Sequence, residues 1–223
     1  MSKKKPKTNP VQNPHDKLFK SVFSLKSEVK GFIRKFMEDW IYEGIDFDTF
    51  QPNPTSFISK EFCETHSDII WEANWKDSAD KISVSFLFEH KSYISDDLPF
   101  QLAEYLIQGY KYHRKNEEKF KVIIPIVIYH DKGEWIKRKF IDYFDLPDPR
   151  LSKYLLNFEY DFIDLRRLAD EFILTIQEAQ ILSSTFLLFK YKGEKEELKR
   201  IISEIFIFVE QKVVNQENKE FYT

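Results

Sequence analysis

The chain has 223 residues, of which 34 are Lys or Arg and 37 are Asp or Glu, so its formal net charge is −3. Hydrophobic residues make up 42% of the chain and aromatic residues 17%. This is enough apolar surface for one main core with an appended element, at roughly 100–200 residues per domain. The near-neutral charge excludes a wholly basic, non-specific nucleic-acid binder, so any contact with DNA must be local.

The single cysteine, Cys63, can form neither an internal disulfide nor a cysteine zinc cluster, which favours a reducing cytoplasm. Residues 1–12 are polar and basic, and we expect them to form a disordered tail. They lead into no apolar segment, and no run in the chain approaches the roughly 18 apolar residues that span a bilayer. We expect neither secretion nor membrane insertion, and no small-molecule cofactor.

Three runs of basic residues are candidates for local contact with DNA. Solvated surface charge is the alternative interpretation of each run. The runs are Lys3, Lys4, Lys5 and Lys7; Lys111, His113, Arg114 and Lys115; and Lys137, Arg138 and Lys139.

The first ordered segment is predicted to be helical. Asn13 is a typical N-cap residue, Pro14 suits the first helical position, and Asp16 can receive backbone N–H groups. Apolar residues recur at helical spacing to about position 42, with a break expected at 24–27. A loop rich in Asp, Pro and Asn is expected to follow.

The later elements alternate between strand and helix patterns. The second and third strands form a hairpin across 76–80, and the continuous β-branched run at 122–129 is typical of a strand buried on both faces. The expected strands are 56–62, 68–75, 81–92, 122–129 and 158–165, and the expected helices are 98–112, 166–189 and 195–214.

The strand at 81–92 ends in a pair of charged residues. Side chains alternate along a strand, so Glu89 and Lys91 share one face while His90 points to the other. The hairpin could set Asp68 beside Glu89, and two carboxylates on adjacent strand ends suit Mg²⁺. The alternative is an ordinary surface pair, but charged residues at the end of an apolar strand are costly without partners.

The helix that follows the strand places Gln101 and Tyr105 on one face. Taken alone, this is an amphipathic helix with a polar rim. In chain order, however, Asp68, Glu89-x-Lys91 and Gln101-x-x-x-Tyr105 resemble the active-site motifs of RecB-like members of the PD-(D/E)xK nuclease superfamily.

Five blocks between about residues 13 and 170 resemble the successive landmarks of the recombination-promoting nuclease (Rpn, YhgA-like) family. The blocks are Pro14-His15-Asp16-Lys17-Leu18-Phe19-Lys20, Ser67-Asp68-Ile69-Ile70, Leu87-Phe88-Glu89-His90-Lys91-Ser92, Leu98-Pro99-Phe100 leading to Tyr105, and Ile124-Pro125-Ile126-Val127-Ile128-Tyr129-His130 before Trp135. The resemblance implies a restriction-endonuclease-like α/β fold, with a mixed central β-sheet flanked by helices, and Mg²⁺-dependent DNA cleavage linked to recombination. Mn²⁺ is expected to substitute for Mg²⁺.

The chain departs from these patterns at three positions. Ser67 stands where the superfamily has proline. Many Rpn relatives have Gln where this chain has Lys91 and Arg where it has Gln101, so both positions are closer here to the general nuclease pattern. These departures do not indicate an inactive core motif.

Three further residues are candidates for an accessory role. His15 and Asp16 would lie near the phosphate path, by the family's His-Asp pair; the alternative is a helix-capping Asp16 and a solvent-facing His15. Glu61 could be an additional carboxylate near the metal, although a surface residue of an edge strand is the simpler interpretation. For His130, a strand-end position is the simplest interpretation, and for Tyr129 it is a core position.

The leading hypothesis is a cytoplasmic DNA endonuclease. Asp68, Glu89 and the backbone carbonyl of His90 would hold Mg²⁺, Lys91 would assist the attacking water, and Gln101 and Tyr105 would orient the site. The alternatives are a non-catalytic DNA-binding or assembly module and a hydrolase of small phosphoesters.

We expect a nuclease-like domain at 13–170 and a helical C-terminal extension at 171–223. The extension has a wide apolar face over 198–213 that either covers the core or pairs with a second copy in a homodimer.

Overall fold

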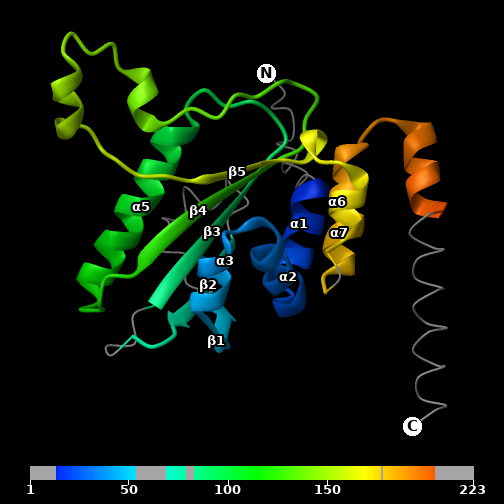
Figure 1. Cartoon of the computed structure of the whole chain (residues 1–223), viewed down its shortest axis with the longest axis horizontal. Coiled ribbons are helices and arrows are strands. Elements are labelled where there is room, and N and C mark those ends of the chain that lie inside the picture. The colour runs from blue at the N-terminus through cyan, green and yellow to red at the C-terminus, as the bar shows by residue number, and fades with distance from the viewer. Residues whose placement is uncertain (1–13, 54–68, 79–82, 177, 204–223) are drawn as a thin grey trace, which may run out of the picture.

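The structure is a computed structural model that describes residues 14–53, 69–78, 83–176 and 178–203 (Figure 1). Its centre is a five-stranded mixed sheet in the order β1-β2-β3-β4-β5. The strands are β1 (Ile45–Pro52), β2 (Ile69–Trp75), β3 (Ser83–Lys91), β4 (Val122–Tyr129) and β5 (Asp161–Asp164).

Helices surround this sheet. The α-helices are α1 (Pro14–Phe23), α2 (Lys26–Phe36), α3 (Asp39–Gly44), α5 (Leu98–Lys115), α6 (Asp170–Leu174) and α7 (Gln180–Lys190), and residues 195–203 are also helical. Three short 3₁₀ helices are η1 (Phe140–Tyr143), η2 (Pro149–Tyr154) and η3 (Leu165–Arg167). The long connection from β4 to β5, which carries η1 and η2, projects beyond the sheet at the upper left of Figure 1.

The strand directions bring two strand ends to one edge of the sheet. β1, β2 and β3 pair in antiparallel fashion, whereas β3, β4 and β5 are parallel. Glu89 of β3 lies opposite Val127 of β4, and the His130 backbone N–H donates to the Lys91 carbonyl at 3.3 Å. The carboxyl ends of β3 and β4 therefore lie side by side, held by the sheet ladder.

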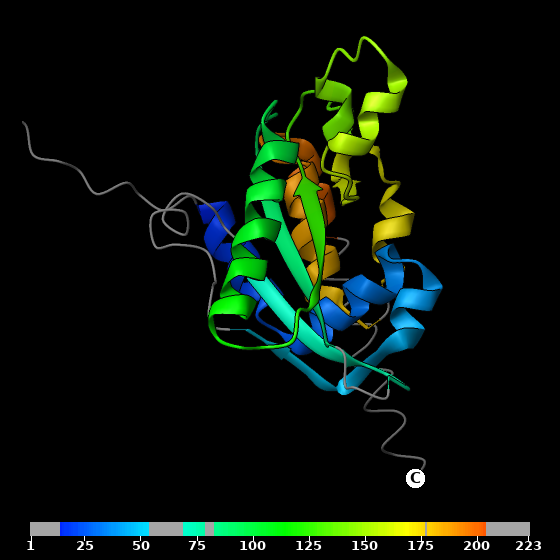
Figure 2. The same cartoon turned by 90° about the vertical axis from the view of Figure 1, so that its left-hand side faces the viewer.

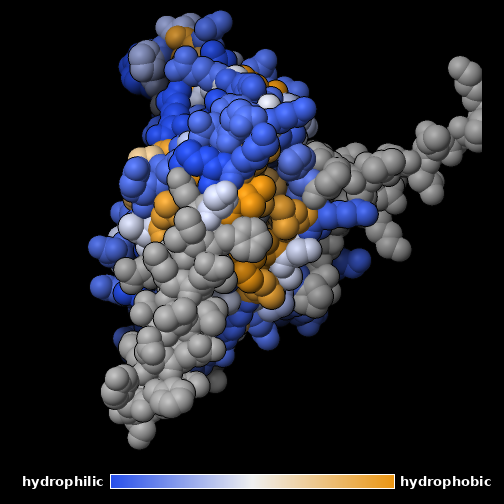
Figure 3. All heavy atoms as spheres, turned by 90° about the vertical axis from the view of Figure 1, so that its right-hand side faces the viewer, coloured by the Kyte–Doolittle hydropathy of each residue, from blue (hydrophilic) through white to orange (hydrophobic). Residues whose placement is uncertain are grey.

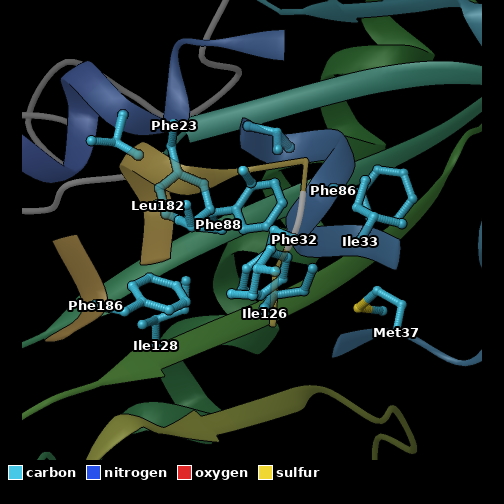
Figure 4. Packing of buried hydrophobic residues seen from close by; sticks show 14 of the residues in the cluster. Phe23, Phe32, Ile33, Met37, Phe86, Phe88, Ile126, Ile128, Leu182 and Phe186 are labelled. Atoms are coloured by element: carbon cyan, nitrogen blue, oxygen red, sulfur yellow. The ribbon is translucent and has the colours of Figure 1, made fainter. Parts of the chain in front are cut away.

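The two faces of the sheet are covered by different helices, as Figure 2 shows. On one face α1, α2 and α7 enclose an aromatic core in which Phe32, Phe88 and Phe186 are all fully buried (Figure 4). On the other face α5 packs Leu102 and Tyr105 against Leu87 of β3. Burial of such side chains stabilises the fold by about 1.5–3 kcal/mol each.

A buried carboxylate joins α2 to α7. Glu28 is 5% exposed, and its Oε2 accepts a hydrogen bond from the Leu182 backbone N–H at 2.8 Å, in the first turn of α7. Gly31 permits this approach, because a Cβ there would lie only 2.5 Å from the Cβ of Ala179. Glu28 thus satisfies an N–H group that the start of α7 leaves without an intrahelical partner.

Most predicted elements are confirmed. The helical segment from position 14 divides into α1, α2 and α3, with its first break inside 24–27, and the hairpin, α5 and β4 form where expected. The loop predicted after position 42 is wrong, because β1 occupies 45–52. Ile45 and Phe50 are buried there, so core packing and pairing with β2 override the loop-forming composition. The predicted strand at 56–62 and the tail at 1–12 lie outside the described residues.

The C-terminal part of the chain contributes to the core. Leu182, Phe186 and Phe189 of α7 belong to the same buried cluster as Phe88 of β3. Figure 3 views the molecule from the side of α7 and residues 195–203 and shows apolar residues gathered in the middle of this face. Within the parts of the chain that the structure describes, no helix has the length and apolar character needed to cross a membrane.

Candidate active site

The charged end of β3 is buried. Phe86 and Phe88 point into the aromatic core, while Glu89 and Lys91 lie on the face covered by α5, as strand alternation predicts. Glu89 is 1% exposed and Lys91 is 2% exposed. Because an ionised side chain loses its hydration when it is buried, such a pair needs close polar partners.

These partners come from the first two turns of α5. Lys91 Nζ lies 2.7 Å from Glu89 Oε1 and donates to Gln101 Oε1 at 2.9 Å. Gln101 Nε2 donates to Glu89 Oε1 at 3.3 Å and to the Tyr105 hydroxyl at 2.8 Å. The four side chains therefore form one connected network, and the predicted shared face of Gln101 and Tyr105 is confirmed.

The chemistry of the network fixes the orientation of the Gln101 amide. An ammonium group can only donate, so the amide atom that faces Lys91 is the oxygen. The amide nitrogen then faces Glu89 and Tyr105, which both accept. Gln101 thus holds the ammonium and the carboxylate together from one side, and Tyr105 holds Gln101.

An exposed aromatic ring flanks the ion pair. Tyr93, in the loop directly after β3, is 55% exposed, and its ring centroid lies 5.6 Å from Lys91 Nζ. Sequence reasoning did not single out Tyr93. The sequence feature that could have indicated Tyr93 is an aromatic residue in the polar loop immediately after Glu89-His90-Lys91.

His90 points to the opposite face of the sheet. Its ring stacks between Phe19, at 4.7 Å between centroids, and His130, at 4.6 Å. Its Nδ1 lies 3.1 Å from Asp16 Oδ1. Because a carboxylate accepts, Nδ1 carries the proton in this contact. Asp16 of α1 therefore holds the imidazole at the end of β3.

The neighbouring imidazoles are neutral at physiological pH. Burial is the main reason that the pKa of His130 falls to about 3, with further lowering by His90 and Lys192. Burial also lowers the pKa of His15. The His15 ring contacts the rings of His130 and Phe189 at 5.7 and 5.5 Å.

These contacts show what the His-Asp pair touches. Asp16 lies in the first turn of α1, where an acidic residue was expected, and its carboxylate also bonds to His90 of β3. The solvent-facing interpretation of His15 is wrong, because His15 packs against rings where the end of β3 lies beside α1. Both residues lie on the face of the sheet opposite Glu89 and Lys91. His130 directly follows β4, which confirms its strand-end interpretation, and it is buried in this stack.

The site offers oxygen donors for a hard cation. Glu89 supplies a carboxylate and His90 a backbone carbonyl, the donor types that Mg²⁺ prefers. Over residues 14–53, 69–78, 83–176 and 178–203, no three His, Cys, Asp or Glu side chains are arranged to hold a metal ion. Asp68 and Glu61, the other predicted carboxylates, lie outside these ranges.

The basic run at 111–115 is less available to DNA than predicted, because one of its members is buried. His113 is fully buried at the C-terminal end of α5, so it is not available to DNA. Lys137, Arg138 and Lys139 are exposed, and Lys139 pairs with Glu159 at 2.6 Å. The run of lysines at 3–7 is outside the described residues.

A family model described as "Putative transposase, YhgA-like" matches residues 13–220. Over 167 residues the chain is 23% identical to the inactive recombination-promoting nuclease-like protein RpnE of Escherichia coli strain K12, covering 74% of this chain and 54% of that protein. It is 22% identical over 174 residues to the recombination-promoting nuclease RpnD of Escherichia coli O157:H7, covering 77% and 66%. It is 25% identical over 177 residues to the recombination-promoting nuclease RpnA of Escherichia coli strain K12, covering 78% and 58%. The chain therefore spans less than two thirds of each relative, and no solved structure matches it.

Proposed function

Since the matched region covers most of the chain, the protein belongs to the YhgA-like transposase family that includes the Rpn proteins, and we propose that it is a metal-dependent DNA endonuclease linked to recombination. The observation that carries this proposal is the buried Glu89–Lys91 pair at the end of β3, joined by Gln101. Burying two charged side chains costs stability, and buried charged groups cluster at active sites. The burial of Glu89 and Lys91 in a chain of this family therefore supports a catalytic role for them.

The proposed metal ligands are Asp68, Glu89 and the carbonyl of His90, in a PD-(D/E)xK arrangement. The last described pair of the hairpin is Ile69 opposite Phe88. In the sequence Asp68 directly precedes Ile69 and Glu89 directly follows Phe88, which supports the assignment. Bound Mg²⁺, or Mn²⁺ in its place, would lower the pKa of its water and offset charge on the phosphate.

The chain's own residues have separate proposed roles. Lys91, as an ammonium, stabilises negative charge on the attacked phosphate and assists the attacking water by stabilising the charge that the water gains as it loses its proton. Gln101 holds the Lys91 ammonium at 2.9 Å, and Tyr105 fixes Gln101 at 2.8 Å. A preorganised donor of this kind contributes about 10²–10³ in rate.

A second function is favoured by one finding, because one relative of similar identity is named inactive. In this reading the chain is a DNA-binding or assembly module that keeps the fold without turnover. The two functions differ in whether cleavage depends on Glu89 and Lys91.

The test is cleavage of supercoiled plasmid by wild-type protein, Glu89→Gln and Lys91→Met, with Mg²⁺, with Mn²⁺ and with chelator. Glu178→Gln is the matched control, since this half-exposed carboxylate pairs with Arg34 in an exposed ion pair. We expect metal-dependent nicking by wild type and Glu178→Gln, and at least about a hundredfold loss in the other two variants. Equal activity in all four proteins would refute the proposed site, and no activity in any would favour the module.

A homodimer is a separate hypothesis, because two copies would present one site to each strand of a duplex. Exposed apolar side chains on the side of α7 and residues 195–203 include Ile181 and Ile202. Sedimentation velocity with and without DNA tests this, and a monomer under both conditions would exclude it.

A further inference from the structure

We propose that Tyr93, Phe100, Tyr143 and Arg138 form a strip that binds an unpaired strand of DNA beside the Glu89–Lys91 pair. The strip rests on the proposed function, since it names the substrate class of the same site. It implies that single-stranded DNA, or a locally unpaired segment, is held next to the bond that is cut.

The strip begins at the ion pair itself. The Tyr93 ring lies 5.6 Å from Lys91 Nζ and is more than half exposed. Phe100, in the first turn of α5, is 42% exposed and directly precedes Gln101, whose amide binds Lys91. The accessible Tyr93 ring therefore borders the predicted position of the phosphate, and the accessible Phe100 ring comes from the residue next to Gln101 in α5.

Ring contacts extend the strip onto the connection between β4 and β5. Phe100 contacts Phe140 at 4.9 Å and Tyr143 at 5.2 Å between centroids. The Arg138 guanidinium lies 5.5 Å from the Tyr143 ring centroid. Arg138 is exposed and forms no ion pair within the described ranges of the chain. A series of contacts thus leads from Phe100, the chain neighbour of Gln101, through Tyr143 to an accessible cation.

Packing alone does not account for these rings. Phe140, which is 9% exposed, already fixes η1 against α5. The exposed parts of the Tyr93 and Phe100 rings do not take part in the packing of η1 against α5. They present flat apolar surface near Lys91 and Arg138. Bases of an unpaired strand stack on such rings, whereas bases inside a duplex are already stacked on each other.

The charge around the strip indicates which force dominates. Burial raises the pKa of Tyr143, Arg138 opposes this rise, and the carboxylates of Asp96 and Asp97 act with burial. Acidic groups therefore stand near Arg138, and Lys137 and Lys139 on either side of it pair with Glu159, so phosphate attraction is limited. With about one phosphate contact, binding of a single strand should fall with salt at a log–log slope of about −0.7.

The experiment is fluorescence anisotropy with a labelled oligodeoxythymidylate and with a hairpin duplex of equal strand length, in chelator, so that cleavage does not interfere. The variants are Tyr93→Ala, Phe100→Ala and Arg138→Gln. The control is Phe120→Ala, because Phe120 is 62% exposed and contacts Tyr110 near the other end of α5. Thermal unfolding verifies that each variant is folded.

We expect the single strand to bind more tightly than the duplex, and each aromatic variant to lose about tenfold in affinity for it while Phe120→Ala does not. Tyr93→Ala decides the case if Phe100→Ala unfolds, because Tyr93 lies in an exposed loop. Equal binding by wild type and Tyr93→Ala, or a preference for duplex, would overturn the strip. Strand binding without metal-dependent cleavage would overturn the nuclease proposal and leave the strip in place.

Discussion

Replacing Lys91 with Met should lower the free energy of unfolding, because it leaves a buried carboxylate without its cation. Met preserves the length of the aliphatic stem but removes the ammonium that lies 2.7 Å from Glu89 Oε1. The Glu89 carboxylate, 1% exposed, then loses its cation. Removing one partner of a buried ion pair destabilises a protein by about 3–5 kcal/mol.

For a chain of this size, 1 kcal/mol shifts the unfolding midpoint by roughly 2–4 °C, so the expected loss is on the order of 10 °C. The double variant Glu89→Gln with Lys91→Met should recover most of this loss, because neither charge is then buried. Thermal and urea unfolding, followed by circular dichroism, give the four corners of a double-mutant cycle. Added Mg²⁺ should stabilise the Lys91→Met variant more than the wild type if Glu89 is a metal ligand.

The matched control is again Glu178→Gln, whose ion pair with Arg34 is exposed and should contribute less than about 1 kcal/mol. A cost for Lys91→Met no larger than the cost for this control would refute the reasoning. It would mean that the Lys91 ammonium does not compensate a buried carboxylate. A double variant as unstable as Lys91→Met would refute it equally, since packing would then explain the loss.

Two other predictions follow from buried polar groups. Asp16→Ala should destabilise the protein by about 1–3 kcal/mol in urea unfolding, because the buried His90 Nδ1–H loses its acceptor. Asp16→Asn keeps an acceptor oxygen and should cost less stability. Equal losses in the two variants would contradict the hydrogen bond. Burial, and next Lys121, lower the pKa of His113 below 6.5, so the unfolded chain binds a proton that the folded protein does not. The contribution of His113 to the free energy of unfolding should therefore be greatest above pH 6.5 and fall as the pH drops below it. His113→Leu should flatten the plot of unfolding free energy against pH in this range, and an unchanged slope would contradict the assignment.

Local patterns were sufficient for much of the site. Alternation along β3 assigned Glu89 and Lys91 to one face and His90 to the other, and helical spacing paired Gln101 with Tyr105. Periodicity of this kind is a property of a few consecutive residues, so it can be read without knowing the fold. The order of the motifs then pointed to the family that the comparisons support.

Other features depend on residues far apart in the chain. Asp16 contacts His90 across 74 positions, and Glu28 caps Leu182 across 154. β1 formed where Asp and Pro predicted a loop, because Ile45 and Phe50 gain burial only once β2 and α2 are in place.

The sequence by itself determined which residues share a face and in what order the motifs occur. Only the tertiary structure decided that Glu89 and Lys91 are buried, that Gln101 joins them, and that Tyr93 and Phe100 stay exposed beside them. The physical reason is that side-chain direction follows from local backbone geometry, whereas burial and hydrogen-bond partners are set by which distant elements pack together.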